Sequence, residues 1–539
     1  MMNRRDLLRY GGVCAGALSG AGRLGRALAA PARPAAQALT ASGRVGGFVD
    51  RGIYAFKGIP YGADTAARRF LAPLPPQPWT GIRAAAEFGP RAPQTGGRSS
   101  GNSGYFLPPD LGPVSEDCLY LNVWTAGLGD GRKRPVLVYI HGGAYSGGSG
   151  NNTLYDGVNL CRRGDAVVVT LSHRLNLFGY LYLAGLSEGF PDSGNAGMLD
   201  LVLALQWVRE NIAAFGGDLR RVLIFGQSGG GAKCATLMGM AAAQGLFHRV
   251  LTMSGQQITA SRPETATARS RAVLKALNLP ESRIGELRTL PMEQLIAATH
   301  AAGYYGPVRD GRTLQRDPFD PDAPPISAGI PMILGNTHDE TRLLIGGADP
   351  SLFSLNWPDL PAKLSVITQF LGDLKPEEVV RQYRALYPDY SPSDLFFAIT
   401  TAFRSWRGQL IEAERRAAQP AGVAPTWVYE LDWPTPIDGG KWGAPHTLDI
   451  PLVFDNTEVA SSMSGNGPEA RHLAMLMSDA CVAFAHTGDP NHRQLPKWKP
   501  FNLASRTTMS FAAYSRPVDD PRREERLLIE QVPYTQPGT

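Results

Sequence analysis

One stretch of the sequence decides the fold: Val222-Leu223-Ile224-Phe225-Gly226-Gln227-Ser228-Gly229-Gly230-Gly231-Ala232-Lys233-Cys234-Ala235-Thr236-Leu237-Met238. Residues 222–225 form a short apolar run that is typical of a buried strand, and residues 232–238 are typical of a helix. The glycines between them permit a sharp turn, which would lift the hydroxyl of Ser228 clear of a sheet. This strand–turn–helix context predicts that Ser228 is a nucleophile.

A second Gly-x-Ser-x-Gly pattern, Gly97-Arg98-Ser99-Ser100-Gly101, lies within a stretch rich in Gly, Ser and Pro that spans residues 96–112. No strand-like run precedes it. We therefore expect a surface loop there, and Ser228 is favoured over Ser99.

Further apolar runs lie before and after Ser228 in the sequence and indicate other buried strands. The predicted strands are residues 136–140, 166–170, 222–225, 331–334 and 427–429. Between the second and third of them, four apolar residues fall on one face of a helix: Leu201, Leu205, Val208 and Ile212. Strands that alternate with helices predict an α/β fold with a central, mostly parallel sheet flanked by helices.

The composition excludes several classes of protein. The chain has 539 residues, of which 43% are apolar and 19% charged, so it is not a disordered chain. Five cysteines are too few for a disulfide scaffold. No run after the leader approaches the roughly 18 apolar residues of a membrane span.

The first residues resemble a twin-arginine export signal. Arg4 and Arg5 precede apolar residues, and a weakly apolar run and the small-residue site Ala27-Leu28-Ala29 follow. We expect residues 1–30 to be this signal and the protein to be exported, either periplasmic or secreted. No lipid anchor is expected, since Cys14 lacks an upstream Leu. Cleavage near Ala30 would lower the net charge from +5 to +1, which gives no support to nucleic-acid binding.

Several ordered motifs resemble the type-B carboxylesterase/cholinesterase family, in particular its bacterial p-nitrobenzyl-esterase-like branch. They are Phe215-Gly216-Gly217-Asp218 with Val222 to Gly230, Glu116 to Val123, Phe56 to Tyr61, Arg69-Phe70 with Pro73, and Gly194-Asn195-Ala196-Gly197 with Asp200. The resemblance implies an α/β-hydrolase fold. After a linker at residues 31–44, it implies one catalytic domain over residues 45–535.

The segment His141-Gly142-Gly143-Ala144-Tyr145 directly follows the predicted strand 136–140. Acyl transfer places negative charge on a carbonyl oxygen, and backbone N–H groups must already point at it. By resemblance, the donors of this oxyanion hole are the amides of Gly143, Ala144 and Gly229.

The general base and its acid partner lie further along the chain. His446, in Gly443-Ala444-Pro445-His446, resembles the family segment that supplies the base. Hydrolase chain order places the acid between Ser228 and His446, where Asp339 and Glu340 follow the strand 331–334. Either carboxylate could orient an imidazole; the resemblance assigns Glu340. His338 beside them does not have a metal-site spacing, so no metal and no cofactor are expected.

The sequence departs from the family at three informative positions. Gln227 stands where Glu is common, which removes a negative charge beside the imidazole. Gly229 replaces the usual Ala but still offers a backbone donor. Ala92 stands where the disulfide partner of Cys118 would be, so that disulfide cannot form.

The loop between residues 92 and 118 contains Tyr105 and Phe106 but no Trp. This disfavours acetylcholine hydrolysis, because the cation–π recognition of choline relies on Trp. Four other aromatic residues could line an acyl or alcohol pocket or could simply pack in the core: Tyr145, Tyr304, Tyr305 and Phe319.

The sequence thus predicts a serine hydrolase that cleaves small-molecule carboxylic esters through an acyl-enzyme on a Ser-His-Glu triad. Two alternatives stay open. The same machinery could hydrolyse amides, carbamates or lactones, or the chain could be a non-catalytic binding protein like the adhesion relatives of cholinesterases. Those relatives lack triad members, whereas every role is filled here.

Overall fold

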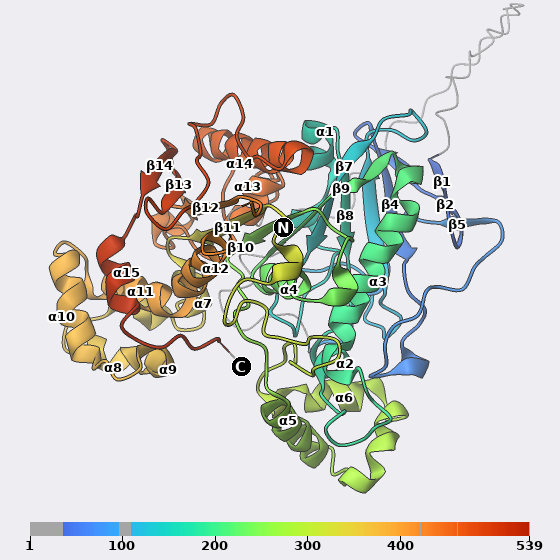
Figure 1. Cartoon of the computed structure of the whole chain (residues 1–539), viewed down its shortest axis with the longest axis horizontal. Helices are drawn as coiled ribbons and strands as arrows, with labels where there is room; N and C mark the ends of the chain where they lie inside the picture. The colour runs from blue at the N-terminus through green and yellow to red at the C-terminus, as the bar shows by residue number, and fades with distance from the viewer. Residues whose placement is uncertain (1–35, 96–108, 421, 461, 538–539) are drawn as a thin grey trace, which may run out of the picture. The chain divides into compact units, whose positions relative to one another are not determined.

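The computed structural model describes residues 36–95, 109–420, 422–460 and 462–537, and the fold is built on a sheet of eleven strands within them (Figure 1). The strand order is β14-β13-β12-β11-β10-β9-β7-β8-β6-β4-β3. The strands from β13 to β8 run parallel, and antiparallel pairs extend the sheet at both sides. The predicted export signal and Ser99 lie outside the described residues.

The five predicted apolar runs correspond to β7, β8, β9, β11 and β12. The sheet has eleven strands in all. They are β3 (Phe48–Asp50), β4 (Ile53–Pro60), β6 (Tyr120–Thr125), β7 (Arg134–Ile140), β8 (Val167–Leu171), β9 (Gly217–Gln227), β10 (Arg249–Met253), β11 (Met332–Thr337), β12 (Thr426–Leu431), β13 (Thr507–Phe511) and β14 (Arg516–Asp519). The predicted α/β-hydrolase architecture, with a mostly parallel sheet, is confirmed. Six strands were not predicted: β3, β4, β6, β13, β14 and β10, which pairs with β9 directly beside the serine.

Helices cover both faces of the sheet. They are α1 (Val158–Gly164), α2 (Asn176–Tyr180), α3 (Ala196–Asn211), α4 (Gly229–Met238), α5 (Pro263–Ala276), α6 (Met292–Ala298), α7 (Glu340–Leu344), α8 (Leu360–Lys363), α9 (Thr368–Leu371), α10 (Pro376–Leu386), α11 (Pro392–Thr401), α12 (Arg407–Ala417), α13 (Asp449–Val453), α14 (Pro468–Thr487) and α15 (Arg523–Ile529). The helix predicted from its apolar face is α3, followed by a 3-10 turn.

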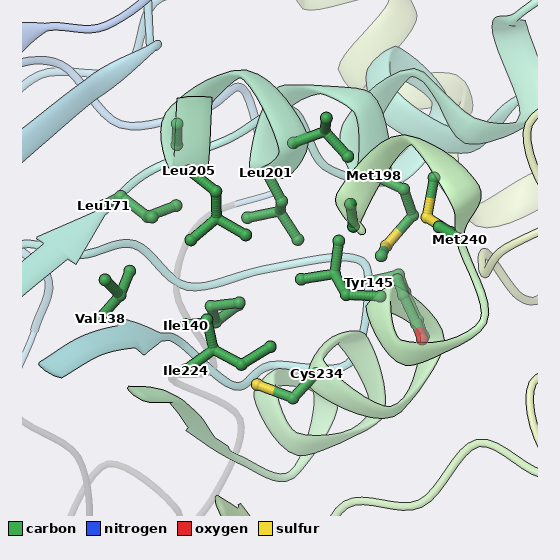
Figure 2. Close-up of a cluster of buried hydrophobic side chains, with 14 of the residues drawn as sticks. Val138, Ile140, Tyr145, Leu171, Met198, Leu201, Leu205, Ile224, Cys234 and Met240 are labelled. Atoms are coloured by element: carbon green, nitrogen blue, oxygen red, sulfur yellow. The ribbon is translucent and has the colours of Figure 1, made fainter. Parts of the chain in front are cut away.

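The period of two along each strand divides the core between the two faces. In β7, Val136, Val138 and Ile140 join the cluster that contains α3 and α4, whereas Leu137 and Tyr139 join the cluster that contains α1, α13 and α14. Figure 2 shows the first cluster, with side chains of α3 facing those of β7 and β9. A third cluster joins α8 to α11 with α15.

A small second sheet marks where the described fold begins. β1 (Gln37–Thr40) pairs with β2 (Gly43–Gly46), which pairs with β5 (Ile82–Ala84). β1 lies inside the segment predicted as a linker, residues 31–44. The compact unit begins at Ala36 and therefore includes the last part of that segment.

Two buried ion pairs explain motifs that carried the family resemblance. Arg69 Nε donates to a carboxylate oxygen of Glu116 at 2.6 Å, and Arg174 Nη2 donates to Asp200 at 2.6 Å. The first pair joins the segment before β6 to the segment after β4, and the second joins α3 to the loop after β8. Removing one partner of such a pair typically costs about 3–5 kcal/mol, because the other charge stays buried.

The cysteines of the described residues are free thiols, and each is buried: Cys118, Cys161, Cys234 and Cys481. Burial raises the pKa of every one of them, to about 12 for Cys161 and for Cys481. In the described part of the chain, no helix has both the length and the apolar character needed to cross a membrane.

Candidate active site

Ser228 occupies the sharp turn between β9 and α4. Its backbone has φ 57° and ψ −128°, a conformation that costs a residue with a side chain about 1–3 kcal/mol. A Cβ atom on Gly230 would overlap the carbonyl oxygen of Ile140, so the turn needs glycine there. Strain of this kind is typical of a nucleophile elbow, and it presents the half-buried serine at the end of the strand.

His446 and Glu340 lie in contact beside this turn. The imidazole is 6% exposed, and its Nδ1 is hydrogen-bonded to Oε2 of the fully buried Glu340. The other carboxylate oxygen accepts bonds from Asn336 Nδ2 at 2.9 Å and from the Thr337 amide at 3.0 Å. Burial alone would raise the pKa of Glu340, but the neighbouring His446, with Ser254 and the Thr337 amide, brings it below its ordinary value.

Asp339, the other candidate acid, has different partners. Its carboxylate accepts bonds from the Ala444 amide at 2.9 Å and from Arg342 Nε at 3.1 Å, and it pairs with His338 Nδ1 at 3.2 Å. The backbone of Asp339 also bonds that of Ala444. Burial raises the pKa of Asp339, but His338 and the other donors outweigh it and hold this pKa well below its usual range. Asp339 therefore fastens the segment that carries His446, while Glu340 contacts the ring itself.

The ring of His446 also contacts Gln227. The Nε2 amide nitrogen of this buried side chain lies 3.2 Å from Nε2 of His446 and 3.4 Å from its Nδ1. Across the described residues, no hydrogen bond joins Ser228 Oγ to the imidazole. Catalytic hydrogen bonds are often long before substrate binds and tighten in the complex. Sequence reasoning considered only the missing charge at position 227, not this contact.

The predicted oxyanion loop lies against the first turn of α4. Gly143 and Ala144 both have positive φ, 88° and 52°. No backbone or side-chain acceptor within the described residues takes their N–H groups. Gly229 is the first residue of α4, where a helix has no partner of its own for the N–H. Three N–H donors are thus available near Ser228.

The four aromatic pocket candidates have different environments. Phe319 is fully buried, and Tyr145 is 2% exposed and donates its hydroxyl to Gln257 Oε1 at 2.8 Å. Tyr304 and Tyr305 line a cavity, and the hydroxyl of Tyr305 donates to the Thr299 carbonyl at 2.8 Å. The packing interpretation therefore describes Phe319 and Tyr145. The cavity that Tyr304 and Tyr305 line is small, and Ser228, Glu340 and His446 are not among its lining residues.

One group of side chains could be considered for a metal. His338, Glu430 and Asp432 place one ligand atom each within 4.8 Å of one another. Glu430 already pairs with the buried guanidinium of Arg522 at 2.8 Å, and this cation disfavours a second positive charge. The sequence carries no signal for the group, because Glu430 in β12 and Asp432 after it are far along the chain from His338.

A family model and several known proteins match most of this chain. The family model described as the carboxylesterase family matches residues 34–529. The chain is 33% identical to the para-nitrobenzyl esterase of Bacillus subtilis (strain 168) over 504 residues, which cover 91% of this chain and 97% of that protein. It is also 33% identical to the phenmedipham hydrolase of Pseudarthrobacter oxydans, covering 86% of this chain and 92% of the relative.

A solved structure gives a similar result. The crystal structure of a Geobacillus stearothermophilus carboxylesterase at pH 6.2 superposes with a TM-score of 0.81 and 37% sequence identity. The match covers 92% of this chain and 99% of that one.

Proposed function

The chain belongs to the carboxylesterase family and is a carboxylic ester hydrolase, and from this premise we propose that it cleaves its substrate in two steps through an acyl-enzyme on Ser228. As Oγ attacks the ester carbonyl, His446 takes the serine proton, and Glu340 holds the imidazole and stabilises the imidazolium. The ring then gives the proton to the leaving alcohol. Water attacks the acyl-enzyme with His446 again as base, which releases the acid and restores Ser228.

The amides of Gly143, Ala144 and Gly229 stabilise the tetrahedral oxyanion in both steps. Losing one such donor typically lowers kcat by about 100–1,000-fold. These residues need no cofactor for this chemistry.

The observation that carries the proposal is the contact between His446 and Glu340 beside the strained serine. The carboxylate is fully buried, and its remaining oxygen is satisfied by Asn336 and Thr337. A carboxylate fixed in this way holds the neighbouring ring in one orientation and one tautomer, which is the function of the acid in such triads.

The test compares the purified wild type with Ser228→Ala on p-nitrophenyl acetate and butyrate. We expect kcat to fall by about 1,000,000-fold in this variant, the scale seen when a triad nucleophile is removed. Ser99→Ala is the matched control, since Ser99 has the same Gly-x-Ser-x-Gly pattern, and it should keep wild-type activity. An inactive wild type, or a Ser228→Ala protein with wild-type activity, would contradict the proposal.

The same assay with other acyl substrates would define the substrate class. Matched p-nitroanilides, a lactone and phenmedipham, which the name of one relative suggests, would show whether the machinery also cleaves other acyl compounds. We expect small esters to give the highest kcat/KM.

Residues 1–30 supply a separate proposal, that the enzyme is exported by a twin-arginine route. Fractionation of cells that produce the full chain should find activity outside the cytoplasm, and Arg4→Lys with Arg5→Lys should retain it inside. Equal distribution of both proteins would contradict export by this signal.

A further inference from the structure

Lys233 is a buried cation in the helix that follows the nucleophile. Lys233 is fully buried, and the other residues of α4 are buried as well. No carboxylate of the described residues pairs with it. Burial lowers the pKa of Lys233 to about 7. A buried amine without a counter-charge costs stability, so its presence calls for an explanation other than packing.

The amine binds the predicted oxyanion loop. Lys233 Nζ donates to the Ala144 carbonyl at 2.8 Å and to the His141 carbonyl at 3.1 Å. It also lies 5.4 Å from the ring centre of Tyr145. These contacts tie both ends of the segment 141–145 to α4.

The other carbonyls of this segment also have donors. His141 Nδ1 donates to the Gly142 carbonyl at 2.8 Å, and the Gly143 carbonyl accepts from the Gly147 amide at 3.0 Å. The backbone N–H of Asn176 donates to the Tyr145 carbonyl at 2.7 Å. A peptide is planar, so the Gly143 and Ala144 N–H groups turn with the Gly142 and Gly143 carbonyls, which His141 and Gly147 hold. Lys233 holds the peptide group on either side of these two, so the whole segment keeps one conformation. Lys233 supplies two of these bonds.

Gly229 makes room for this arrangement. A Cβ atom there would overlap the Ala144 carbonyl oxygen, which is the atom that Lys233 binds. The glycine at position 229 and the lysine four residues later therefore act on the same oxygen. This gives a physical reason for the departure from the usual Ala.

We propose that Lys233 is a positioning residue for the oxyanion hole: by holding the His141 and Ala144 carbonyls, it fixes the peptide groups that flank those carrying the Gly143 and Ala144 N–H groups, so that these two amides point at the developing oxyanion. The proposal rests on the acyl-transfer function proposed above. An amine keeps at least two N–H groups in either protonation state, so both bonds persist when it loses a proton. The cost of burying it is offset by donors that need no reorganisation during the reaction.

The experiment compares the full-length wild type with Lys233→Met, which has a similar length and no donor, and with Lys233→Gln, which keeps an N–H donor. Arg416→Met is the matched control, because Arg416 is also buried and donates to carbonyls, those of Ser327 and Ile330, away from the site. The measurements are kcat and KM for p-nitrophenyl butyrate, the inhibition constant of an aryl trifluoromethyl ketone, and the melting temperature. The ketone adds to Ser228 and forms an oxyanion, so it reports on the hole directly.

We expect Lys233→Met to lower kcat by about 10–100-fold, less than the loss of a direct donor, with KM within about threefold. Ketone affinity should fall in parallel with kcat, and Lys233→Gln should recover part of both. Arg416→Met should change the melting temperature but neither kcat nor ketone affinity.

A Lys233→Met protein with kcat and ketone affinity within threefold of wild type would overturn the proposal. If Lys233→Met does not fold, Lys233→Leu, which also lacks a donor, with unchanged ketone affinity, or a proportional loss of kcat and ketone affinity in Arg416→Met, would overturn it as well. Failure of the acyl-transfer function is distinguishable, because the Ser228→Ala protein would then keep wild-type activity.

Discussion

The two sides of the His446 ring meet different environments. On the Nδ1 side, Glu340 is fully buried and its donors come from the ring, Asn336 and the Thr337 backbone. Toward the nucleophile, no hydrogen bond in the described residues joins the half-buried Ser228 to the ring, and the Gln227 amide nitrogen lies 3.2 Å from Nε2 and 3.4 Å from Nδ1. The fold itself holds the acid side in place, whereas the serine side still has to form its bond when a substrate arrives.

The largest loss of activity should follow from changing Glu340, which contacts Nδ1 of His446. Glu340→Gln keeps the shape but replaces the acceptor of the Nδ1 proton, and kcat should fall by about 10,000-fold, as when the acid of such a triad becomes an amide. Steady-state kinetics on p-nitrophenyl butyrate measure this. A smaller loss than that of Asp339→Asn would transfer the role of the acid to Asp339.

On the side of the nucleophile, Gly229→Ala tests how closely the oxyanion loop (residues 141–145) approaches the first residue of α4. The added Cβ would displace the Ala144 carbonyl, and we expect kcat to fall by about 10–100-fold, because the donor N–H is kept but its neighbours move. Gly239→Ala is a control for adding a methyl group, because Gly239 is the C-cap of α4 and a Cβ there meets only ordinary van der Waals contacts. Wild-type kinetics in Gly229→Ala would show that the loop adapts freely.

A smaller effect is expected from Gln227→Glu. A carboxylate near Nε2 favours the charged imidazolium, so the acid limb of the kcat/KM–pH profile should move to higher pH. Activity at pH 6 should fall about three- to tenfold, while activity above pH 8 should stay near that of the wild type. Gln227→Met, which adds no charge, should leave the limb in place; a shift in both variants would rule out the electrostatic reason.

The smallest effect on kcat should come from Asp339→Asn, which changes stability instead. The pKa of Asp339 lies well below its unfolded value near 4, so its contribution is present above about pH 4 and is lost in acid. The pKa of His338 is raised to about 9, so its contribution is complete below about pH 6.5 and is lost as the pH rises through 9.

The difference in melting temperature between wild type and Asp339→Asn should therefore be greatest between about pH 4 and pH 6.5 and smaller at pH 9.5. Thermal unfolding in matched buffers measures it. A difference that grows at alkaline pH would contradict the pairing of Asp339 with His338.

Local patterns in the sequence were enough to predict the central strands and the turn at Ser228, because both depend on neighbouring residues. β10 was missed although Val250, Leu251 and Met253 are apolar, since its run is short and is followed by no motif. Asp339 and Glu340 are adjacent in the sequence, so only the family resemblance separated them. Their contacts with Ala444 and His446 arise from the packing of β11 beside β12.

The role of Lys233 was not predicted, although the sequence around it is unusual. A single lysine in a run of small and apolar residues is unusual for a buried helix. Its partners, the carbonyls of His141 and Ala144, are backbone atoms of a distant loop. Backbone acceptors leave no trace in the sequence, so the contact could not be predicted from residue types.

The four buried thiols can be used to measure local unfolding of the regions that contain them. Cys234 lies in α4 behind Ser228, Cys161 in α1 and Cys481 in α14, on the opposite face of the sheet, and Cys118 precedes β6. Their raised pKa values and burial leave little thiolate to react with a labelling reagent in the folded state. Each labelling rate then measures how often its own region exposes itself to solvent, so mass spectrometry of alkylated peptides would map whether the two faces of the sheet open together or separately.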